Sequence, residues 1–298
     1  MNATEPSQTA LLAAAARAAH LIVDDKPLIF SDPLAYALLG DRAEEFLQYH
    51  RLHGTHVVLA EARSAVITRS RFTEERLVEA VDRGVDQYVI LGAGLDSYAF
   101  RQPARGRNGL RVFEVDHPAT QLWKRDRLRE IAESPFSDLQ DDSPLTFVPV
   151  DLETEPLTPH LLANGFDPAR PAFVSWLGVT MYLTREAIDA ALAAIGALAP
   201  GTEIVVDYLL PAELRDEAGQ TYVDNVAPIS AERGEPWVTF LSPEEMAELL
   251  HEHGFEVIRQ VTRRESVEPE YWDRTDALQP SSLGMLAHAG VRRPIVEP

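Results

Sequence analysis

Short apolar runs separated by longer amphipathic segments fill the chain from about residue 85 onward. Five runs rich in β-branched and aromatic residues read QYVILG, LRVFEVD, LTFVPVD, AFVSWLG and TEIVVDYLL, and helical patterns separate several of them. Near-continuous apolar strands that alternate with helices are typical of a parallel sheet covered on both faces. FEVIRQV and SLGMLAHAG predict two last strands. The pattern therefore predicts a doubly wound, Rossmann-like α/β fold.

Capping residues mark the predicted helices between and before these strands. Thr184 caps TREAIDAALAAIGALAPG, and Ser242 begins SPEEMAELLHEHG with a capping box. Upstream, residues 55–70 form one predicted helix, and Thr73 is the predicted N-cap of the next. Gly84 marks the end of that second helix.

Two segments depart from the alternation of strands and helices. Residues 1–84 are predicted to be helical, and we expect them to form part of the cover of an active site. That site would be built on an α/β domain over residues 85–298. Residues 211–240 are polar and interrupt the alternation after the fifth strand, so they predict an inserted lid.

Composition narrows the classes of function. The formal net charge is −20, from 27 basic and 47 acidic residues, which disfavours non-specific binding to nucleic acid or to an anionic membrane. The absence of cysteine excludes disulfides, thiolate nucleophiles and cysteine-based zinc sites. No apolar stretch approaches the roughly 18 residues of a membrane-spanning helix, and no basic region precedes the early Ala/Leu run. We expect a cytoplasmic protein.

A metal site is not expected from the histidines. His50, His53 and His56 are three residues apart, so a helix would place them on one side. Gly54 weakens a helix there, and Glu61 is not aligned with them as a carboxylate ligand. The sequence therefore predicts no metal.

The run VILGAGLDS ends a predicted strand in two glycines and an aspartate. Gly92 and Gly94 allow a ligand to approach the backbone at the end of the first strand of a doubly wound sheet. Asp96 would place a negative charge where the phosphates of a dinucleotide lie. The following YAFRQPARGRNG contains Pro103 and Gly106 and is a poor long helix. The loop therefore favours a ligand that lacks phosphates and carries an ammonium.

Carboxylates end the next two strands. Asp116 falls 24 residues after Gly92, close to the spacing at which a carboxylate accepts hydrogen bonds from ribose hydroxyls. Glu114, two residues earlier on the same side of the strand, is the alternative. Asp151 ends the third strand, where a carboxylate is placed to accept from an adenine amino group. A ribose without phosphates, together with an ammonium, describes S-adenosyl-L-methionine.

The motifs RSRFTEERL, ILGAGLDSYAFR, FEVDHP, VPVDLE and MYLTREAI occur in this order. Together with KPLIFSDPLAYALLG near the N-terminus, they resemble the leucine carboxyl methyltransferase family of class I methyltransferases. The resemblance spans roughly residues 10–290. It implies a seven-stranded sheet and an S-adenosyl-L-methionine site.

The resemblance also implies roles for single residues. It puts Gly92 beside the methionine part of the cofactor, Asp116 on the ribose, and Asp151 with Leu152 on the adenine. An arginine before the first strand would pair with the methionine carboxylate, and both Arg69 and Arg71 are candidates. Arg69 is preferred because Arg69-Ser70 aligns with the Arg-Ser/Thr pair of family members, and a guanidinium suits a carboxylate.

One position departs from the family pattern. Many relatives carry a glutamate in the fourth-strand motif, where this chain has Leu177 in SWLGVTMYL. The contact that this loop makes to the cofactor ammonium is therefore in question, and a backbone carbonyl or Asp96 would take it over.

Methyl transfer from a sulfonium is an SN2 reaction, so the protein mainly aligns the nucleophile and excludes water. A carboxylate acceptor needs no general base, whereas a hydroxyl usually does. Tyr182, after the fourth strand, is the candidate for orienting the acceptor oxygen, and His117 is the candidate base. The aromatic residues Tyr222, Trp237, Tyr271 and Trp272 would either line an acceptor pocket or pack the lid.

These inferences predict an S-adenosyl-L-methionine-dependent O-methyltransferase acting on a carboxylate or hydroxyl of a small acceptor, such as a secondary metabolite. Two alternatives remain open at this point. One is a carboxyl methyltransferase that acts on a peptide or protein C-terminus, and the other is a non-catalytic protein that binds the cofactor.

Overall fold

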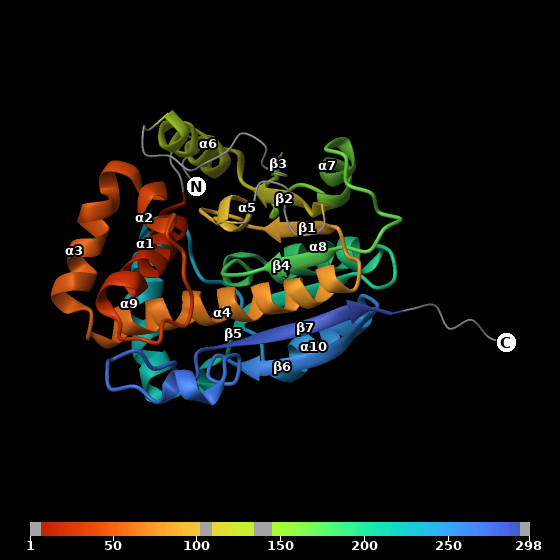
Figure 1. The fold of residues 1–298 in the computed structure, drawn as a ribbon. Coiled ribbons are helices and arrows are strands. Elements are labelled where there is room, and N and C mark those ends of the chain that lie inside the picture. The colour runs from red at the N-terminus through yellow and green to blue at the C-terminus, as the bar shows by residue number, and fades with distance from the viewer. Residues whose placement is uncertain (1–6, 102–108, 134–144, 293–298) are drawn as a thin grey trace.

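A single mixed sheet organises the molecule. The computed structural model describes residues 7–101, 109–133 and 145–292. Seven strands follow the order β3-β2-β1-β4-β5-β7-β6, and only β7 runs antiparallel to its neighbours (Figure 1). The strands are β1 (Gln87–Leu91), β2 (Arg111–Asp116), β3 (Leu145–Pro149), β4 (Phe173–Trp176), β5 (Glu203–Leu209), β6 (Phe255–Thr262) and β7 (Gly284–Val291). All seven fall on the apolar runs of the sequence, so the predicted doubly wound sheet is confirmed.

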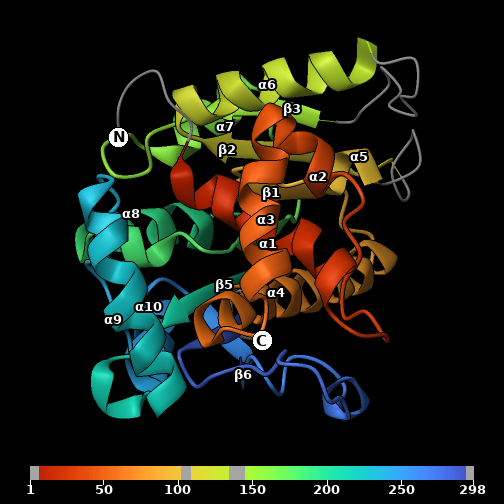
Figure 2. The same ribbon diagram turned by 90° about the vertical axis from the view of Figure 1, so that its left-hand side faces the viewer.

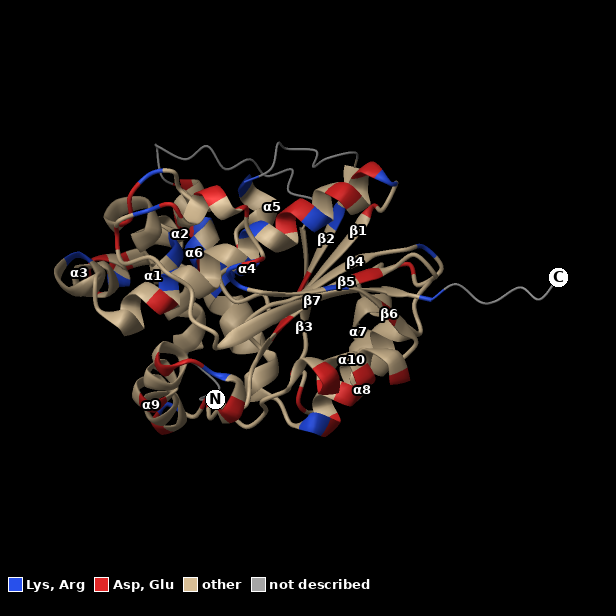
Figure 3. Cartoon of the chain, turned by 90° about the horizontal axis from the view of Figure 1, so that it is seen from below, with Lys and Arg blue, Asp and Glu red and all other residues tan. Residues whose placement is uncertain are grey.

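Helices cover both faces of the sheet. α4 (Val57–Asp82) and α5 (Tyr98–Arg101) lie on one face, and α7 (Leu157–Ala163), α8 (Arg185–Gly196) and α10 (Pro243–Glu252) lie on the other (Figure 3). α6 (Pro118–Glu133) follows β2 and contacts β3. Because helices cover both faces, β1, β4 and β5 are buried at every position, and most of their residues are apolar.

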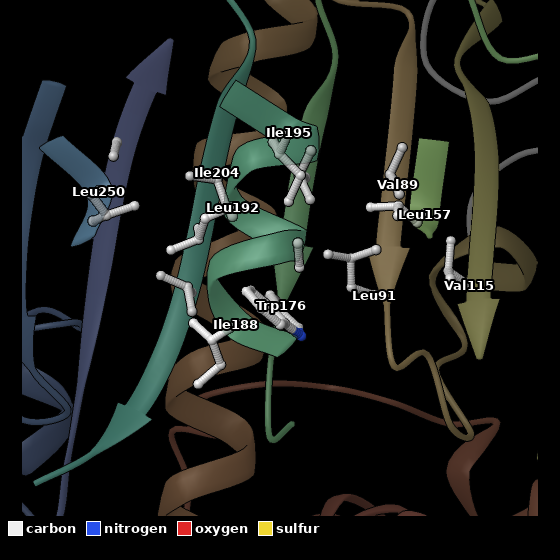
Figure 4. Packing of buried hydrophobic residues seen from close by; sticks show 14 of the residues in the cluster. Val89, Leu91, Val115, Leu157, Trp176, Ile188, Leu192, Ile195, Ile204 and Leu250 are labelled. Carbon is white, nitrogen blue, oxygen red and sulfur yellow. The ribbon is translucent and has the colours of Figure 1, made fainter. Parts of the chain in front are cut away.

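The largest cluster of buried side chains lies between the sheet and the helices α7, α8 and α10. Trp176 of β4 and Ile204 of β5 pack against Ile188 and Leu192 of α8, and Leu250 of α10 extends the cluster (Figure 4). Trp176, Ile188, Leu192, Ile204 and Leu250 are all fully buried. Burying one such aliphatic side chain contributes about 1.5–3 kcal/mol. This buried layer therefore holds β4 and β5 in place, and with them the positions of their carboxyl ends.

The remaining helices lie beyond the carboxyl ends of the parallel strands. They are α1 (Gln8–Val23), α2 (Ala35–Leu38), α3 (Ala43–His53) and α9 (Glu217–Glu232), the last of which comes from the polar insertion. Figures 1 and 2 show them gathered at this end, with α1 packed against α3 and α4 and with α9 beside α4.

The predicted helix boundaries are partly correct. Thr184 and Ser242 cap α8 and α10, Ser242 within a capping box. α4 ends at Asp82, followed by its C-cap Arg83 and by Gly84 at a φ of +102°. Thr73 as an N-cap is wrong, because it lies inside the 26-residue helix α4, where it is buried. No glycine or proline interrupts residues 57–82, so nothing ends the first predicted helix before Thr73.

No helix among the described residues is long and apolar enough to cross a membrane.

Candidate functional site

A cavity of about 570 Å³ lies at the carboxyl ends of the parallel strands. Its walls come from the loops after β1 to β4, from α4, and from the covering helices α1 and α9. Every site residue predicted from the sequence lines this cavity except Arg71: Arg69, Gly92, Gly94, Asp96, Asp116, His117, Asp151, Leu152 and Tyr182. Ligands of open α/β sheets bind at this edge.

The glycines after β1 allow a close approach between two loops. Gly92 and Gly94 have φ values of +63° and +52°, which side-chain-bearing residues rarely adopt. A Cβ on Gly92 would overlap the side chain of Val179 in the loop after β4. The bare backbone of Gly92 therefore forms the floor between the loops of β1 and β4.

Asp116 holds this glycine loop from the neighbouring strand. Its carboxylate accepts hydrogen bonds from the backbone N–H of Gly94 and of His117, the latter at 2.6 Å. Burial raises the pKa of Asp116, and the two backbone donors act against that rise. The carboxylate thus lines the cavity while it fixes the loop after β1.

Glu114, the alternative to Asp116, does not line the cavity. It is fully buried between β2 and α6 and pairs with Lys124 at 2.5 Å. Burial raises the pKa of Glu114 to about 7, against the opposing effect of Lys124. Asp116, the last residue of β2, therefore faces the cavity, whereas Glu114, two residues earlier, faces α6.

Asp96 and Asp151 lie on either side of Asp116. Asp96 lines the cavity and accepts from the backbone N–H of Tyr98 at 2.8 Å. Asp151 accepts from the backbone N–H of Glu153 at 3.0 Å and keeps its carboxylate on the cavity wall, beside Leu152. The carboxylate end of the cavity, which we define as Asp116, His117, Asp151 and Leu152, thus lies over β2 and β3.

Arg69 enters the cavity from α4 and is held by Asp207, a residue that the sequence analysis did not identify. Asp207 Oδ2 lies 3.1 Å from Arg69 Nη1, and Asp207 Oδ1 accepts from the backbone N–H of Gly178 at 2.5 Å. Asp207 is buried within β5. An acid inside the otherwise apolar run IVVDYLL was the available signal, since buried carboxylates are almost always paired.

Arg71, the other candidate for the methionine carboxylate, does not line the cavity. Its guanidinium pairs with Glu75 at 2.8 Å and with Glu268 at 3.1 Å, and it donates to the hydroxyl of Tyr271 at 2.7 Å. Two residues along a helix turn the side chain by about 200°. The same α4 that presents Arg69 to the cavity therefore presents Arg71 to the far side.

The other end of the cavity is aromatic. We call it the aromatic end and define it as Met181, Tyr182, Leu209, Tyr222, Trp237 and Leu283. The rings of Tyr222 and Trp237 are stacked at 6.2 Å with an interplanar angle of 18°. Burial raises the pKa of Tyr182, so its hydroxyl stays protonated at neutral pH. Tyr222 and Trp237 therefore line the cavity, whereas Tyr271 contacts Arg71 and Trp272 contacts Arg264.

His117 lies at the opposite end from Tyr182. It follows Asp116 directly, and its ring Nδ1 accepts from the backbone N–H of Ala119 at 3.3 Å. His117 follows β2 and Tyr182 follows β4, and these strands are two positions apart in the sheet, which is about 10 Å at ~4.8 Å per strand. The two residues therefore line the cavity from different strand ends.

The three evenly spaced histidines do not converge. His50 is buried beside Arg63 at 3.2 Å, and burial lowers the pKa of His50 to about 4. His56 caps α4 by accepting from the backbone N–H of Val58 at 3.3 Å. Within residues 7–101, 109–133 and 145–292, no group of three or more His, Cys, Asp or Glu side chains is arranged to hold a metal ion.

Known proteins resemble this chain in sequence and in fold. The sequence model of the leucine carboxyl methyltransferase family matches residues 10–196. A Bacillus subtilis (strain 168) protein named "Putative S-adenosyl-L-methionine-dependent methyltransferase YktD" is 32% identical over 277 residues, covering 85% of this chain and 88% of that protein. A Mycobacterium avium (strain 104) protein with the same general name is 31% identical over 296 residues, covering 86% and 88%.

Solved structures share the fold. A crystal structure described as a "putative methyltransferase" from Thermobifida fusca YX has a TM-score of 0.57 at 21% identity, covering 97% of this chain and 96% of that one. A DUF574 family protein from Streptomyces avermitilis MA-4680 has a TM-score of 0.56 at 16% identity, covering 93% and 97%. The strand order with an antiparallel β7 is that of class I methyltransferases. The chain therefore belongs to the leucine carboxyl methyltransferase family and is an S-adenosyl-L-methionine-dependent methyltransferase.

Proposed function

We propose that the protein transfers the methyl group of S-adenosyl-L-methionine to a carboxylate or hydroxyl oxygen of a small acceptor. The observation that carries this proposal is one continuous cavity with a carboxylate end over β2 and β3 and an aromatic end beside β5. Its volume of about 570 Å³ lies within the ~300–1,000 Å³ range of small-molecule sites. A cofactor along the first part leaves the aromatic end for the acceptor.

The order of the polar groups along the sheet edge fits the order of the cofactor's parts. Asp151 and Leu152 would hold the adenine, and Asp116 would accept from the ribose hydroxyls. Gly92 and Gly94 offer bare backbone to the methionine part. Arg69 uses Nη1 for Asp207 and has further N–H groups for the methionine carboxylate. Asp96 would receive the ammonium, because Leu177 on the opposite loop carries no charge.

The residues of the chain would orient the acceptor and exclude water from the reacting groups. The bound cofactor supplies an electrophilic methyl group. Tyr182, protonated because of its raised pKa, would donate a hydrogen bond that orients the acceptor oxygen. Residues 1–84 contribute α1 to the cover, and the insertion at 211–240 contributes α9. Both helices line the cavity, and exclusion of water by them would prevent hydrolysis of the sulfonium.

Two measurements test this function. Calorimetry of the full chain with S-adenosyl-L-methionine and with its demethylated product should show binding of both, and binding of neither would refute the proposal. A lysate incubated with the protein and methyl-labelled cofactor should then show label in small molecules. Label that appears instead in macromolecules would support a peptide or protein C-terminus as the acceptor. Tight binding without any transfer would support a non-catalytic role.

A further inference from the structure

The chemistry of the acceptor follows from a carboxylate at the aromatic end, an inference that rests on the proposed function. Glu235 lines the cavity in the loop after α9 and is 8% exposed. Its Oε2 accepts from the backbone N–H of Thr9 at 3.2 Å, in the first turn of α1. Among the described residues no cation lies within ion-pair distance of Glu235. A carboxylate has about four acceptor sites, so with one hydrogen bond made most of its capacity to accept hydrogen bonds is still free.

The cations that line the cavity are already neutralised. Arg17 pairs with Asp32 at 2.8 Å, Arg69 with Asp207 at 3.1 Å, and Arg263 with the buried Glu61. Arg69 would in addition face the carboxylate of the cofactor. Glu235 is therefore the uncompensated charge at the aromatic end, and its field repels an anionic acceptor. A group that donates a hydrogen bond to Glu235 is attracted instead.

A second polar atom at this end requires an acceptor. The indole Nε1 of Trp237 is buried and has no hydrogen-bond partner among the described residues. The neighbouring Tyr182 hydroxyl interacts with this N–H without completing a hydrogen bond to it. A buried N–H without a partner is destabilising, so a ligand atom that accepts from it is favoured. A hydroxyl group would both donate to Glu235 and accept from Trp237, whereas a carboxylate accepts only and an ammonium donates only.

The walls favour a flat ring behind that hydroxyl. Tyr222 and Trp237 present stacked aromatic rings, and Met181, Leu209 and Leu283 add apolar surface. Aromatic faces favour planar partners in offset-stacked or edge-to-face arrangements.

We propose that the acceptor is a phenol and that Glu235 is the general base that accepts its proton. The O–H proton passes to the Glu235 carboxylate while an oxygen lone pair forms the bond to the methyl carbon. The C–S bond breaks, and its electron pair stays on sulfur as the neutral thioether. The positive charge of the sulfonium and the negative charge of the carboxylate are both consumed, and Glu235 then releases the proton to solvent.

The other candidate groups do not take this role. Tyr182 stays protonated because burial raises its pKa, so it does not take the proton of the acceptor. His117 lies over β2 at the opposite end of the cavity.

The test uses 2-naphthol and 2-naphthoate as matched flat probes, with formation of the demethylated cofactor as the readout. The wild-type chain should methylate 2-naphthol and not 2-naphthoate. Glu235→Gln keeps an oxygen for the Thr9 N–H and should lower kcat for 2-naphthol by about 10²–10⁴-fold, the usual contribution of a general base. Glu232→Gln, an exposed change three residues earlier, should leave kcat unchanged.

The pH profile separates a base from a structural residue. In Glu235→Gln the reaction would depend on the ionised phenol, so its rate should rise about tenfold per pH unit below the pKa of the phenol. The wild-type rate should change much less over the same interval. A variant that had only lost structure would show no such recovery at high pH.

The outcomes are distinguishable from failure of the proposed function. Loss of cofactor binding in the wild type would refute the function itself. With cofactor binding intact, three results would overturn the phenol proposal: methylation of 2-naphthoate at an equal or higher rate, an unchanged kcat in Glu235→Gln, or transfer to neither probe.

Discussion

Asp116 binds the glycine loop and lines the cavity at the same time. One carboxylate accepts the backbone N–H groups of Gly94 and His117 and still has lone pairs toward the cavity. At the scale of single residues, we therefore expect this side chain to act in two ways: by contacting the cofactor and by fixing the shape of the loop.

Asp116→Asn should lower the affinity for the demethylated cofactor about 10- to 100-fold. The amide is isosteric but uncharged, and hydrogen bonds to a charged group contribute about 1.5–3 kcal/mol. Calorimetry measures the change. Asp126→Asn, an exposed change on α6, is the control and should leave affinity unaltered. An affinity within twofold of wild type in Asp116→Asn would contradict the assignment of Asp116 to the ribose.

Arg69 and Arg71 form a matched pair on one helix. Arg69→Lys should weaken cofactor binding at least tenfold, because an ammonium cannot bridge Asp207 and a carboxylate in the planar fashion of a guanidinium. Arg71→Lys should leave cofactor affinity within about twofold, since Arg71 contacts Glu75, Glu268 and Tyr271 outside the cavity. Titration of both variants with the demethylated cofactor decides this, and equal losses would refute the distinction.

At the scale of elements, β2 and α6 share a buried ion pair behind the cavity. Glu114 on β2 contacts Lys124 on α6, and one of its carboxylate oxygens, Oε1, has no partner among the described residues. Its pKa is raised to about 7, against ~4.3 for an unfolded glutamate. The folded state therefore binds this proton more tightly than the unfolded chain does.

The sign of the pH effect follows from that difference. The contribution of Glu114 to stability is fully present below about pH 4.3 and is lost as the pH rises to about 7. Glu114→Gln carries no titrating group there, so the free energy of unfolding of the variant relative to wild type should be higher at pH 7.5 than at pH 5. Urea denaturation at both pH values measures it, with the exposed Glu130→Gln as control. Parallel pH profiles for wild type and Glu114→Gln would contradict the prediction.

At the scale of the whole molecule, helix α1 contacts the loops at the carboxyl ends of the strands around the cavity. Arg17 of α1 donates to the carbonyl of Leu95 in the glycine loop at 2.6 Å, and α1 lines much of the cavity. α10 packs against the buried core on one face of the sheet. None of its residues lines the cavity. A ligand should therefore stabilise α1 directly and α10 only through global stability.

Hydrogen exchange tests this arrangement. The demethylated cofactor should slow amide exchange in residues 8–23 and 92–101 more than in α10, because ligand contacts suppress local opening where they are made. Protection of α9 should appear only when an acceptor is added as well, since α9 borders the aromatic end. Equal protection of α1 and α10 by the cofactor alone would show that α1 is not part of the cofactor's cover.

The sequence by itself determined the sheet and the carboxylate end of the cavity. Apolar runs located every strand, and Gly92, Asp116 and Asp151 could be recognised because parallel strands bring their carboxyl ends to one edge. That inference needs only the order of strands along the chain. The caps at Thr184 and Ser242 were equally local signals, since an N-cap depends on a few neighbouring residues.

Only the tertiary structure decided the side chains that depend on rotation or on distant neighbours. The phase of α4 separated Arg69 from Arg71, the end of β2 separated Asp116 from Glu114, and the position of the insertion brought Tyr222, Trp237 and Glu235 to the cavity. Only the structure showed that Asp207 pairs with Arg69, which lies 138 residues away in the sequence. A sequence pattern records which residues are apolar, whereas the direction of a side chain and its partner across the fold are set by packing.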